Sequence, residues 1–288
     1  MISKVGLIVE GGGMRGAYTA GVLEAFLDHD LYFPYAIGVS AGANTLCSYL
    51  SKQKLRNKRL YTEWITDKRF INWRNLFTEG AYFGMNFLFD ELPSKLDPFD
   101  MENFRKSNTC FKVGVTNCLT GECEFVEPKS APTLADANQM LKASSSLPFI
   151  SKMVTLNGKP YLDGGISDSI PIRQAQKDGY TYNVVILTRN TDYRKTYSKS
   201  THLLAKYRLN RYPLLAQTLA NRYMAYNETL DYLAQLEEEG KVFILRPTLP
   251  LKVSRYEKNK DKLYDLYDQG YAECMTQLPK LLEWLNSK

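Results

Sequence analysis

The first 50 residues alternate between apolar runs and glycine-rich turns, and the order of these segments restricts the fold more than any other feature of the chain. Val5–Val9 is a continuous apolar run rich in β-branched residues, which predicts a buried strand. A glycine-rich loop follows at residues 10–16, and residues 17–29 carry one apolar stripe at helical spacing. A second short strand ends at Ser40, and residues 43–52 form the next predicted helix. This order of segments predicts a parallel βαβ unit.

The remaining residues continue the alternation of strands and helices. Further strands are predicted at residues 111–116, 122–126, 153–156, 159–162, 183–188 and 242–245, and further helices at residues 133–143, 172–177, 202–239 and 260–285. Residues 55–106 are predicted to be mostly helix and aromatic-rich loop. Their aromatic side chains predict core or lid packing, with a substrate groove as the alternative. We therefore predict an α/β fold with a central, mostly parallel sheet flanked by helices.

After Arg189 the predicted elements become mainly helical, which places a domain boundary near residue 190. Residues 191–288 are expected to form a mainly helical C-terminal extension. The strand at residues 242–245 leaves open a return of this extension to the main sheet, so that both parts would share one core.

The composition predicts a globular, cytoplasmic protein. The 288 residues are 44% hydrophobic and 24% charged, without low-complexity tracts or internal repeats. We find no signal-peptide pattern, and no apolar run approaches the ~20 residues that span a bilayer. The five cysteines lack the paired spacing of a metal site, so we expect free thiols and no metal; a disulfide between Cys118 and Cys123 is the alternative.

Positive charge is concentrated in two segments. The net charge is +6, and basic residues gather at residues 52–59 and again between Arg189 and Arg211. Such runs are ordinarily solvated faces; the alternative is attraction to anionic lipid head groups, which would associate the protein with a membrane surface. No nucleic-acid-binding motif accompanies the charge, so we expect no nucleic-acid partner.

Ser40 is the candidate nucleophile. It lies in Gly38-Val39-Ser40-Ala41-Gly42, directly after the second strand, which is the Gly-x-Ser-x-Gly pattern of a nucleophile elbow. In such an elbow the serine hydroxyl lies at the tip of a tight turn, and Gly38 and Gly42 relieve the crowding. The motif predicts acyl transfer through a serine ester, whereas a plain strand-to-helix corner would look the same.

A serine hydroxyl needs a positioned base, and histidine is the usual one. The chain has two histidines, His29 and His202. His29 lies in a predicted surface turn. His202 permits the order Ser40, Asp163, His202 of a histidine triad, but it falls within the basic segment, and only one strand and one helix precede the strand that leads to Ser40. We therefore regard a carboxylate as the better candidate.

Asp163 is that carboxylate. It ends a predicted strand immediately before Gly164 and Gly165, which let the backbone turn sharply and approach another main chain. An ionised carboxylate placed against Ser40 would accept the hydroxyl proton directly. The alternative is a turn in which Asp163 caps its own backbone.

The glycine-rich loop supplies candidate donors for an oxyanion. Gly11, Gly12 and Gly13 offer consecutive N–H groups at the start of a predicted helix, and Arg15 adds a positive charge. The segment ending at Gly16 also matches the Gly-x-Gly-x-x-Gly dinucleotide fingerprint, but the second strand lacks the acidic residue that would hold a ribose.

These three motifs, taken in this order, resemble the patatin-like phospholipase family. The matching segments are Gly11-Gly12-Gly13-Met14-Arg15-Gly16, Gly38-Val39-Ser40-Ala41-Gly42 and Asp163-Gly164-Gly165. The resemblance spans residues 5–190 as a catalytic domain, and residues 191–288 are similar to the C-terminal extension of bacterial cytoplasmic members. Ser144-Ser145-Ser146-Leu147-Pro148 is similar to a Ser/Ala-rich family segment ending in Pro, which we expect to be structural; a role as a wall of the site is the alternative.

The resemblance implies a Ser40–Asp163 dyad without histidine, cofactor or metal. It implies a lipid acyl hydrolase that acts on esters of phospholipids or other acylglycerols. Two alternatives stay open, an acyltransferase of the same mechanism and a non-catalytic lipid-binding or regulatory protein. The sequence does not specify the lipid class or the oligomeric state.

Overall fold

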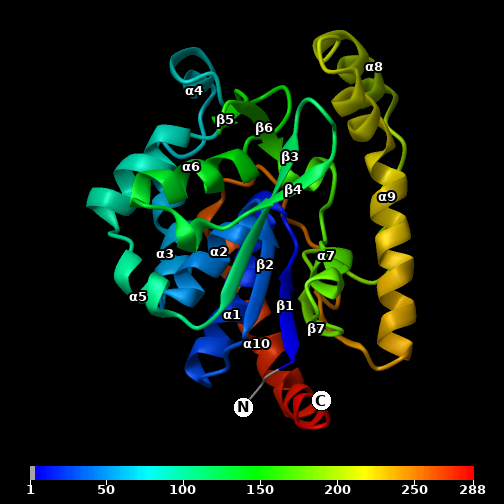
Figure 1. The fold of residues 1–288 in the computed structure, drawn as a ribbon. Coiled ribbons are helices and arrows are strands. Elements are labelled where there is room, and N and C mark those ends of the chain that lie inside the picture. The colour runs from blue at the N-terminus through cyan, green and yellow to red at the C-terminus, as the bar shows by residue number, and fades with distance from the viewer. Residues whose placement is uncertain (1–3) are drawn as a thin grey trace.

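The computed structural model describes residues 4–288 as helices packed on one eight-stranded sheet (Figure 1). The strand order is β5-β6-β3-β2-β1-β7-β8, and β4 pairs with β3 beside this path. The strands are β1 (Val5–Val9), β2 (Tyr35–Val39), β3 (Cys110–Asn117), β4 (Cys123–Val126), β5 (Val154–Leu156), β6 (Lys159–Asp163), β7 (Tyr182–Ile186) and β8 (Val242–Leu245).

The centre of the sheet is parallel and one edge is antiparallel. The four pairings that join β3, β2, β1, β7 and β8 are parallel, and the three that involve β4, β5 and β6 are antiparallel. Every residue of β1 and β2 is buried, because helices cover both faces of the sheet. The predicted α/β class with a mostly parallel sheet is confirmed.

Successive residues of β1 face opposite layers of helices. Leu7 and Val9 pack in a core with residues of α1, α2 and α10, whereas Ile8 packs with residues of α7 and α9. The helices are α1 (Gly16–Asp28), α2 (Ala41–Leu50), α3 (Arg56–Thr62), α4 (Trp73–Thr78), α5 (Met101–Lys106), α6 (Leu134–Ser144), α7 (Ile172–Lys177), α8 (Lys199–Arg208), α9 (Pro213–Glu238) and α10 (Lys260–Asn286), with a π-helical segment at Phe87–Leu96.

The residues after 190 contribute to the sheet and to both helical layers. β8 pairs in parallel with β7, α9 covers one face, and α10 packs against α1. The two helices approach closely through glycines. A Cβ added at Gly270 would lie 2.1 Å from the carbonyl oxygen of Tyr18, and one added at Gly21 would lie 2.0 Å from that of Tyr267. The Tyr18 hydroxyl also donates a hydrogen bond of 2.9 Å to Glu273.

The cysteines and the helices bear on two expectations from the composition, namely the state of the thiols and the absence of a membrane-spanning segment. All five cysteines are free, so the disulfide alternative between Cys118 and Cys123 is wrong. Among residues 4–288, no helix is both long enough and apolar enough to cross a membrane.

Candidate active site

Ser40 lies between β2 and α2 in a strained backbone conformation. Its φ is 55° and its ψ is −127°, a region that non-glycine residues rarely adopt. The backbones on both sides are too close for side chains, since a Cβ added at Gly38 would lie 2.9 Å from the nitrogen of Ala43. One added at Gly42 would lie 2.6 Å from the carbonyl oxygens of Val9 and Glu10. The glycines of the motif therefore allow the turn to pack against β1.

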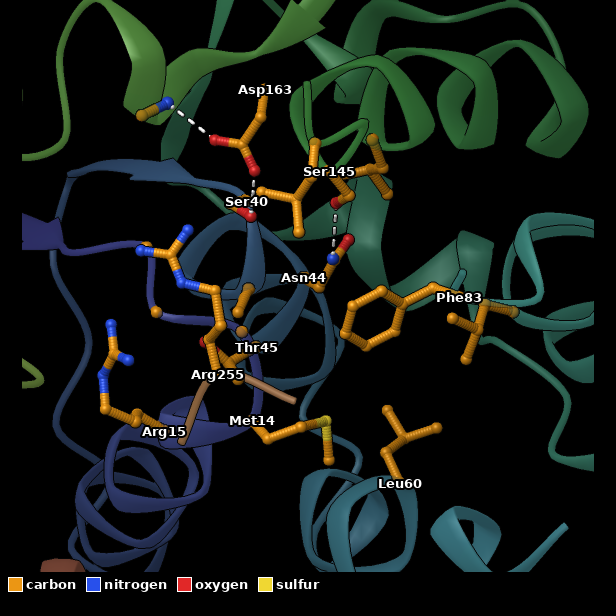
Figure 2. A pocket seen from close by; sticks show the side chains of 18 of the residues that line it. Met14, Arg15, Ser40, Asn44, Thr45, Leu60, Phe83, Ser145, Asp163 and Arg255 are labelled. Atoms are coloured by element: carbon orange, nitrogen blue, oxygen red, sulfur yellow. Dashed lines mark hydrogen bonds between the residues drawn. The ribbon is translucent and has the colours of Figure 1, made fainter. Parts of the chain in front are cut away.

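The structure brings Ser40 and Asp163 into direct contact, although 123 positions separate them (Figure 2). The Ser40 hydroxyl donates a hydrogen bond of 2.6 Å to Oδ2 of Asp163. Oδ1 accepts a second bond of 2.7 Å from the backbone N–H of Gly165. A Cβ added at Gly164 would lie 2.2 Å from the carbonyl oxygen of Gly114, so the chain after Asp163 runs directly against β3. Asp163 is 4% exposed.

Opposing influences act on the Asp163 carboxyl. Burial raises its pKa above the ordinary aspartate value, because the charged form loses water. The bond from Ser40, the positive charges of Arg222 and Arg255, and the N–H of Gly165 each favour the ionised form and lower the pKa. The net direction is upward, which suits a proton acceptor better than an unperturbed, weakly basic carboxylate.

The serine-rich segment expected to be structural holds this pair in place. The Ser40 N–H donates to the Ser144 hydroxyl at 2.8 Å, and that hydroxyl donates to the Gly114 carbonyl at 2.7 Å. The Asp163 N–H donates to the Ser146 carbonyl at 2.8 Å. These bonds tie both sides of the pair to the end of α6 and to β3.

The glycine-rich loop lies beside the elbow, as the motif predicts. A Cβ added at Gly11 would lie 2.8 Å from the Val39 carbonyl oxygen and 3.1 Å from Cβ of Ser40. Gly12 packs against Thr188, and Gly13 has a φ of 58°. Within residues 4–288, the N–H groups of Gly11 and Gly12 donate no hydrogen bond, so they remain available in the loop that lies beside Ser40. Gly16 begins α1, packed against Tyr61.

Charged residues other than the predicted Arg15 and Asp163 also line the pocket. Glu10 accepts hydrogen bonds from the Thr188 N–H at 2.6 Å and from the Tyr226 hydroxyl at 2.7 Å. Basic residues surround this carboxylate, namely Arg15, Arg189, Lys195, Arg222 and Arg255. Arg15 is 6% exposed, and burial together with Arg189 and Arg255 lowers its pKa to about 10.

The opposite side of the pocket is apolar. Figure 2 shows Leu60 and Phe83 on one side of Ser40, with Arg15 and Arg255 on the other and Met14 between them at the base of the view. Further apolar lining comes from the aromatic-rich region, from α6 and from the serine-rich segment, namely Phe70, Met85, Leu88, Phe89, Leu92, Phe99, Leu141 and Leu147. The groove alternative for residues 55–106 thus describes part of their role, because many of these side chains belong to the core at the same time.

Neither histidine lines the pocket. His202 is exposed on α8, and the His29 ring lies 2.9 Å from the Ala25 carbonyl in the turn after α1. Within the part of the chain that the structure describes, no cluster of His, Cys, Asp and Glu has the composition of a metal site. The groups next to Ser40 are thus a carboxylate, backbone N–H donors and guanidinium groups.

Comparisons with known proteins agree with this description. Residues 7–175 match the family model "Patatin-like phospholipase", and residues 212–286 match a domain of unknown function, DUF6363. The uncharacterized protein YjjU of Escherichia coli (strain K12) is 30% identical over 194 residues, which are 64% of this chain and 52% of that protein.

Two further relatives are 25% identical. Lysophospholipase NTE1 of Meyerozyma guilliermondii aligns over 66% of this chain and 13% of its own length. The probable lipid hydrolase 463L of Invertebrate iridescent virus 6 aligns over 59% of this chain and 63% of its own. The chain thus spans about half the length of YjjU and less than two thirds of the other relatives. Because the family model covers more than half of the chain and all three of its motifs, the chain belongs to the patatin-like phospholipase family.

Proposed function

We propose that the protein is a lipid acyl hydrolase in which Ser40 is the nucleophile and Asp163 the base. The observation that carries the proposal is the 2.6 Å hydrogen bond from the Ser40 hydroxyl to the buried Asp163 carboxylate. A nucleophile and a base within hydrogen-bond distance are the minimum that acyl transfer through a serine ester requires. The names of two relatives, a lysophospholipase and a probable lipid hydrolase, support a lipid substrate.

The proposed reaction has two halves. Asp163 takes the proton from Ser40 while Oγ attacks the acyl carbonyl carbon. The negative charge that develops on the carbonyl oxygen is stabilised by the N–H groups of Gly11 and Gly12, near the N-terminus of α1. Gly13 and Arg15 add to the positive field there. Asp163 then returns the proton to the departing alcohol, which leaves an acyl ester on Ser40. A water molecule gives its proton to Asp163 and attacks the acyl carbon of the ester. Asp163 then returns that proton to the Ser40 oxygen as the fatty acid leaves, which restores the starting state.

The pocket fits an amphipathic ester. The apolar side, around Leu60 and Phe83, can accommodate an acyl chain, and Ser40 lies between this side and the polar one. An acyltransferase would use the same first half with an alcohol in place of water, and the two are separated by the products formed when an alcohol is added.

We also propose a peripheral contact with membranes through exposed side chains of α4 and α8. Trp73 and Phe77 on α4 are 66% and 90% exposed, and Leu203 and Tyr207 on α8 are exposed beside Lys206. Figure 1 shows α4 and α8 at the end of the molecule toward which β1 and β2 run, and Ser40 directly follows β2. Exposed aromatic and basic side chains together suit the interface of an anionic bilayer.

The direct test combines a covalent probe with a lipid-ester assay. A fluorophosphonate should label the wild-type protein and not Ser40→Ala, and Asp163→Asn should lower kcat by about 10²–10⁴-fold, the usual contribution of a general base. His202→Ala should keep full activity. Full esterase activity in Ser40→Ala would refute the mechanism, and loss of activity in His202→Ala with retention in Asp163→Asn would favour a histidine triad. Lipid binding without labelling would indicate a non-catalytic protein.

A further inference from the structure

Five basic side chains from distant parts of the chain meet on one side of the pocket. Arg15 lies at the start of α1, Arg222 lies on α9, and the others come from loops after β7 and before α10, namely Arg189, Lys195 and Arg255. Two carboxylates face them, Glu10 and Asp163. We refer to these five residues as the cationic cluster.

The protein leaves the cationic cluster largely unpaired. No ion pair within residues 4–288 includes any of its members. Glu10 is already bonded to Thr188 and Tyr226, and Asp163 to Ser40 and Gly165.

The guanidinium groups have few hydrogen bonds. Nε of Arg15 and Nε of Arg189 are buried and make none among the described residues. Arg189 instead stacks on the Tyr193 ring at 4.2 Å, and the Lys195 ammonium lies 3.3 Å from the centre of the Tyr226 ring. Arg222 is the exception, since it donates to the Gly165 carbonyl and to the Ser169 hydroxyl. The Lys195 ammonium also donates to the Ser169 hydroxyl, at 3.5 Å.

Such an arrangement costs folding free energy. Burial and the charge of Arg222 hold the pKa of Lys195 well below its usual range, and burial with Arg189 lowers that of Arg15. Cations that repel one another in a poorly hydrated pocket destabilise the fold unless an anion neutralises them. A costly, unpaired group of charges beside a candidate nucleophile is therefore best explained by a ligand that supplies the missing negative charge.

The number of positive charges in the cationic cluster indicates what kind of anion it binds. The oxyanion of acyl transfer carries a single developing charge and already has backbone donors at Gly11 and Gly12. Four guanidinium groups facing two carboxylates leave an excess of positive charge that a monoanion does not neutralise, even before Lys195 is counted. A phosphate monoester carries about −1.5 to −2 at pH 7 and three acceptor oxygens, and guanidinium groups match its geometry through paired N–H donors.

We propose that the cationic cluster binds the phosphate monoester head group of the lipid substrate. The enzyme then prefers acyl esters of glycerol phosphate to neutral acylglycerols. This proposal rests on the proposed function. The placement agrees with one molecule spanning the site, with its acyl chain beside Phe83, its ester carbonyl at Ser40 and its phosphate beside Arg255 (Figure 2).

The first experiment compares hydrolysis of lipids that differ in head-group charge. Phosphatidic acid, phosphatidylglycerol and diacylglycerol are presented in the same uncharged detergent micelles to the wild type, Arg189→Gln, Arg255→Gln and the control Lys280→Gln. Lys280 is exposed on α10 and does not line the pocket.

The wild type should hydrolyse phosphatidic acid with a higher kcat/KM than either phosphatidylglycerol or diacylglycerol. The ratio of kcat/KM for phosphatidic acid to that for diacylglycerol should fall about 10–100-fold in each pocket variant, which corresponds to one lost charge-assisted hydrogen bond. The ratio should not change in Lys280→Gln. A wild type without this preference, or a ratio that stays constant in both pocket variants, overturns the proposal.

The second experiment measures binding without turnover. By calorimetry, Ser40→Ala should bind phosphatidic acid micelles, and the same protein with Arg189→Gln added should bind them at least about tenfold more weakly. Binding of inorganic phosphate alone, with no binding of phosphatidic acid, would overturn the head-group proposal in favour of a free-anion site. Absence of hydrolysis with every lipid would refute the proposed function. The binding experiment would still show whether the cationic cluster binds the phosphate head group.

Folding of the variants is checked by thermal unfolding. Because the removed cations form no ion pair with the protein, Arg189→Gln and Arg255→Gln should unfold at or above the wild-type midpoint. Phosphate should raise the wild-type midpoint more than that of either variant. Variants that unfold well below the wild type would mean that the cations stabilise the fold, which contradicts the proposal.

Discussion

At the scale of single residues, the pair at the centre of the pocket is positioned mainly by backbone contacts. Ser40 is held at a φ of 55° by the turn between β2 and α2, and Asp163 is oriented by the N–H of Gly165. Backbone contacts of this kind explain why both motifs contain glycines. They also mean that side chains farther away can tune the pair without touching the Ser40 hydroxyl.

Arg222 is the side chain best placed to do so. Its charge lowers the pKa of Asp163, opposing the upward effect of burial. A base acts only when ionised, so activity is lost as the pH falls through its pKa. Arg222→Gln should therefore raise the Asp163 pKa further and move the acid limb of the kcat/KM profile to higher pH. The pH–rate profile with an uncharged ester measures this.

Two control variants separate the effect of the Arg222 charge on the Asp163 pKa from a structural effect of the substitution. Arg222→Lys keeps a positive charge and should place the acid limb closer to that of the wild type. Arg208→Gln removes a distant exposed charge and should leave the limb where it is. An acid limb that is the same in Arg222→Gln and wild type would contradict the assignment of Asp163 as the titrating base.

At the scale of secondary-structure elements, the contact between α1 and α10 ties the last helix to the first. Gly270 lies against the backbone of α1, where a Cβ would be 2.1 Å from the Tyr18 carbonyl oxygen. Alanine is the better helix former by about 1 kcal/mol, but the added methyl group would push the helices apart. Because overpacking costs about 1–3 kcal/mol and the contacted atom belongs to rigid backbone, we expect a net loss of stability in Gly270→Ala.

Denaturant unfolding measures this loss. The control Asp265→Ala changes an exposed position of the same helix and should stay within about 0.5 kcal/mol of the wild type. Unchanged stability in Gly270→Ala would mean that α10 can shift without cost.

Local patterns were sufficient to predict most elements. The run Val242–Leu245 and the segment 172–177 match β8 and α7, and Thr133 caps α6 through a capping box with Asp136. The three motifs also predicted which residues meet in the pocket. These signals are local, because they depend on residues a few positions apart.

The rest of the site depends on contacts between distant segments. Arg222 lies on a helix of low amphipathicity and Arg255 in a loop, and no neighbouring residue marks either as part of a pocket. From the sequence alone, the basic run after residue 188 is expected to form one solvated face. The fold divides this run, since Arg189 and Lys195 line the pocket while Lys206 and Arg208 are exposed. Only the pairing of β7 with β8 and the packing of α9 decide this division.

At the scale of the whole molecule, the proposed membrane contact makes a prediction about lipid presentation. Phe77→Ser should weaken binding to anionic vesicles about tenfold, as expected for the loss of one large apolar side chain at the interface. Leu282→Ser is the matched control, because this exposed leucine lies on α10, whose C-terminal end is opposite to α4 in Figure 1. Vesicle sedimentation measures both.

The same variants should differ less when the substrate is presented as a water-soluble ester. Phe77→Ser should hydrolyse such an ester at the wild-type rate, since α4 does not line the pocket. Equal vesicle binding by Phe77→Ser and wild type would exclude α4 from the contact.

The packing of α10 on α1 also has a consequence for how the chain folds during synthesis. Tyr18 and Glu273, which bond across this contact, are 255 positions apart. At about 5–20 residues per second, a ribosome needs about 10–50 s to extend the chain from one to the other. For that time the face of α1 that packs against α10 has no partner, although α2, α3 and the motifs around Ser40 have already been made. This face therefore stays uncovered on the nascent chain until α10 has been made, and Arg255, which precedes α10, joins the pocket late.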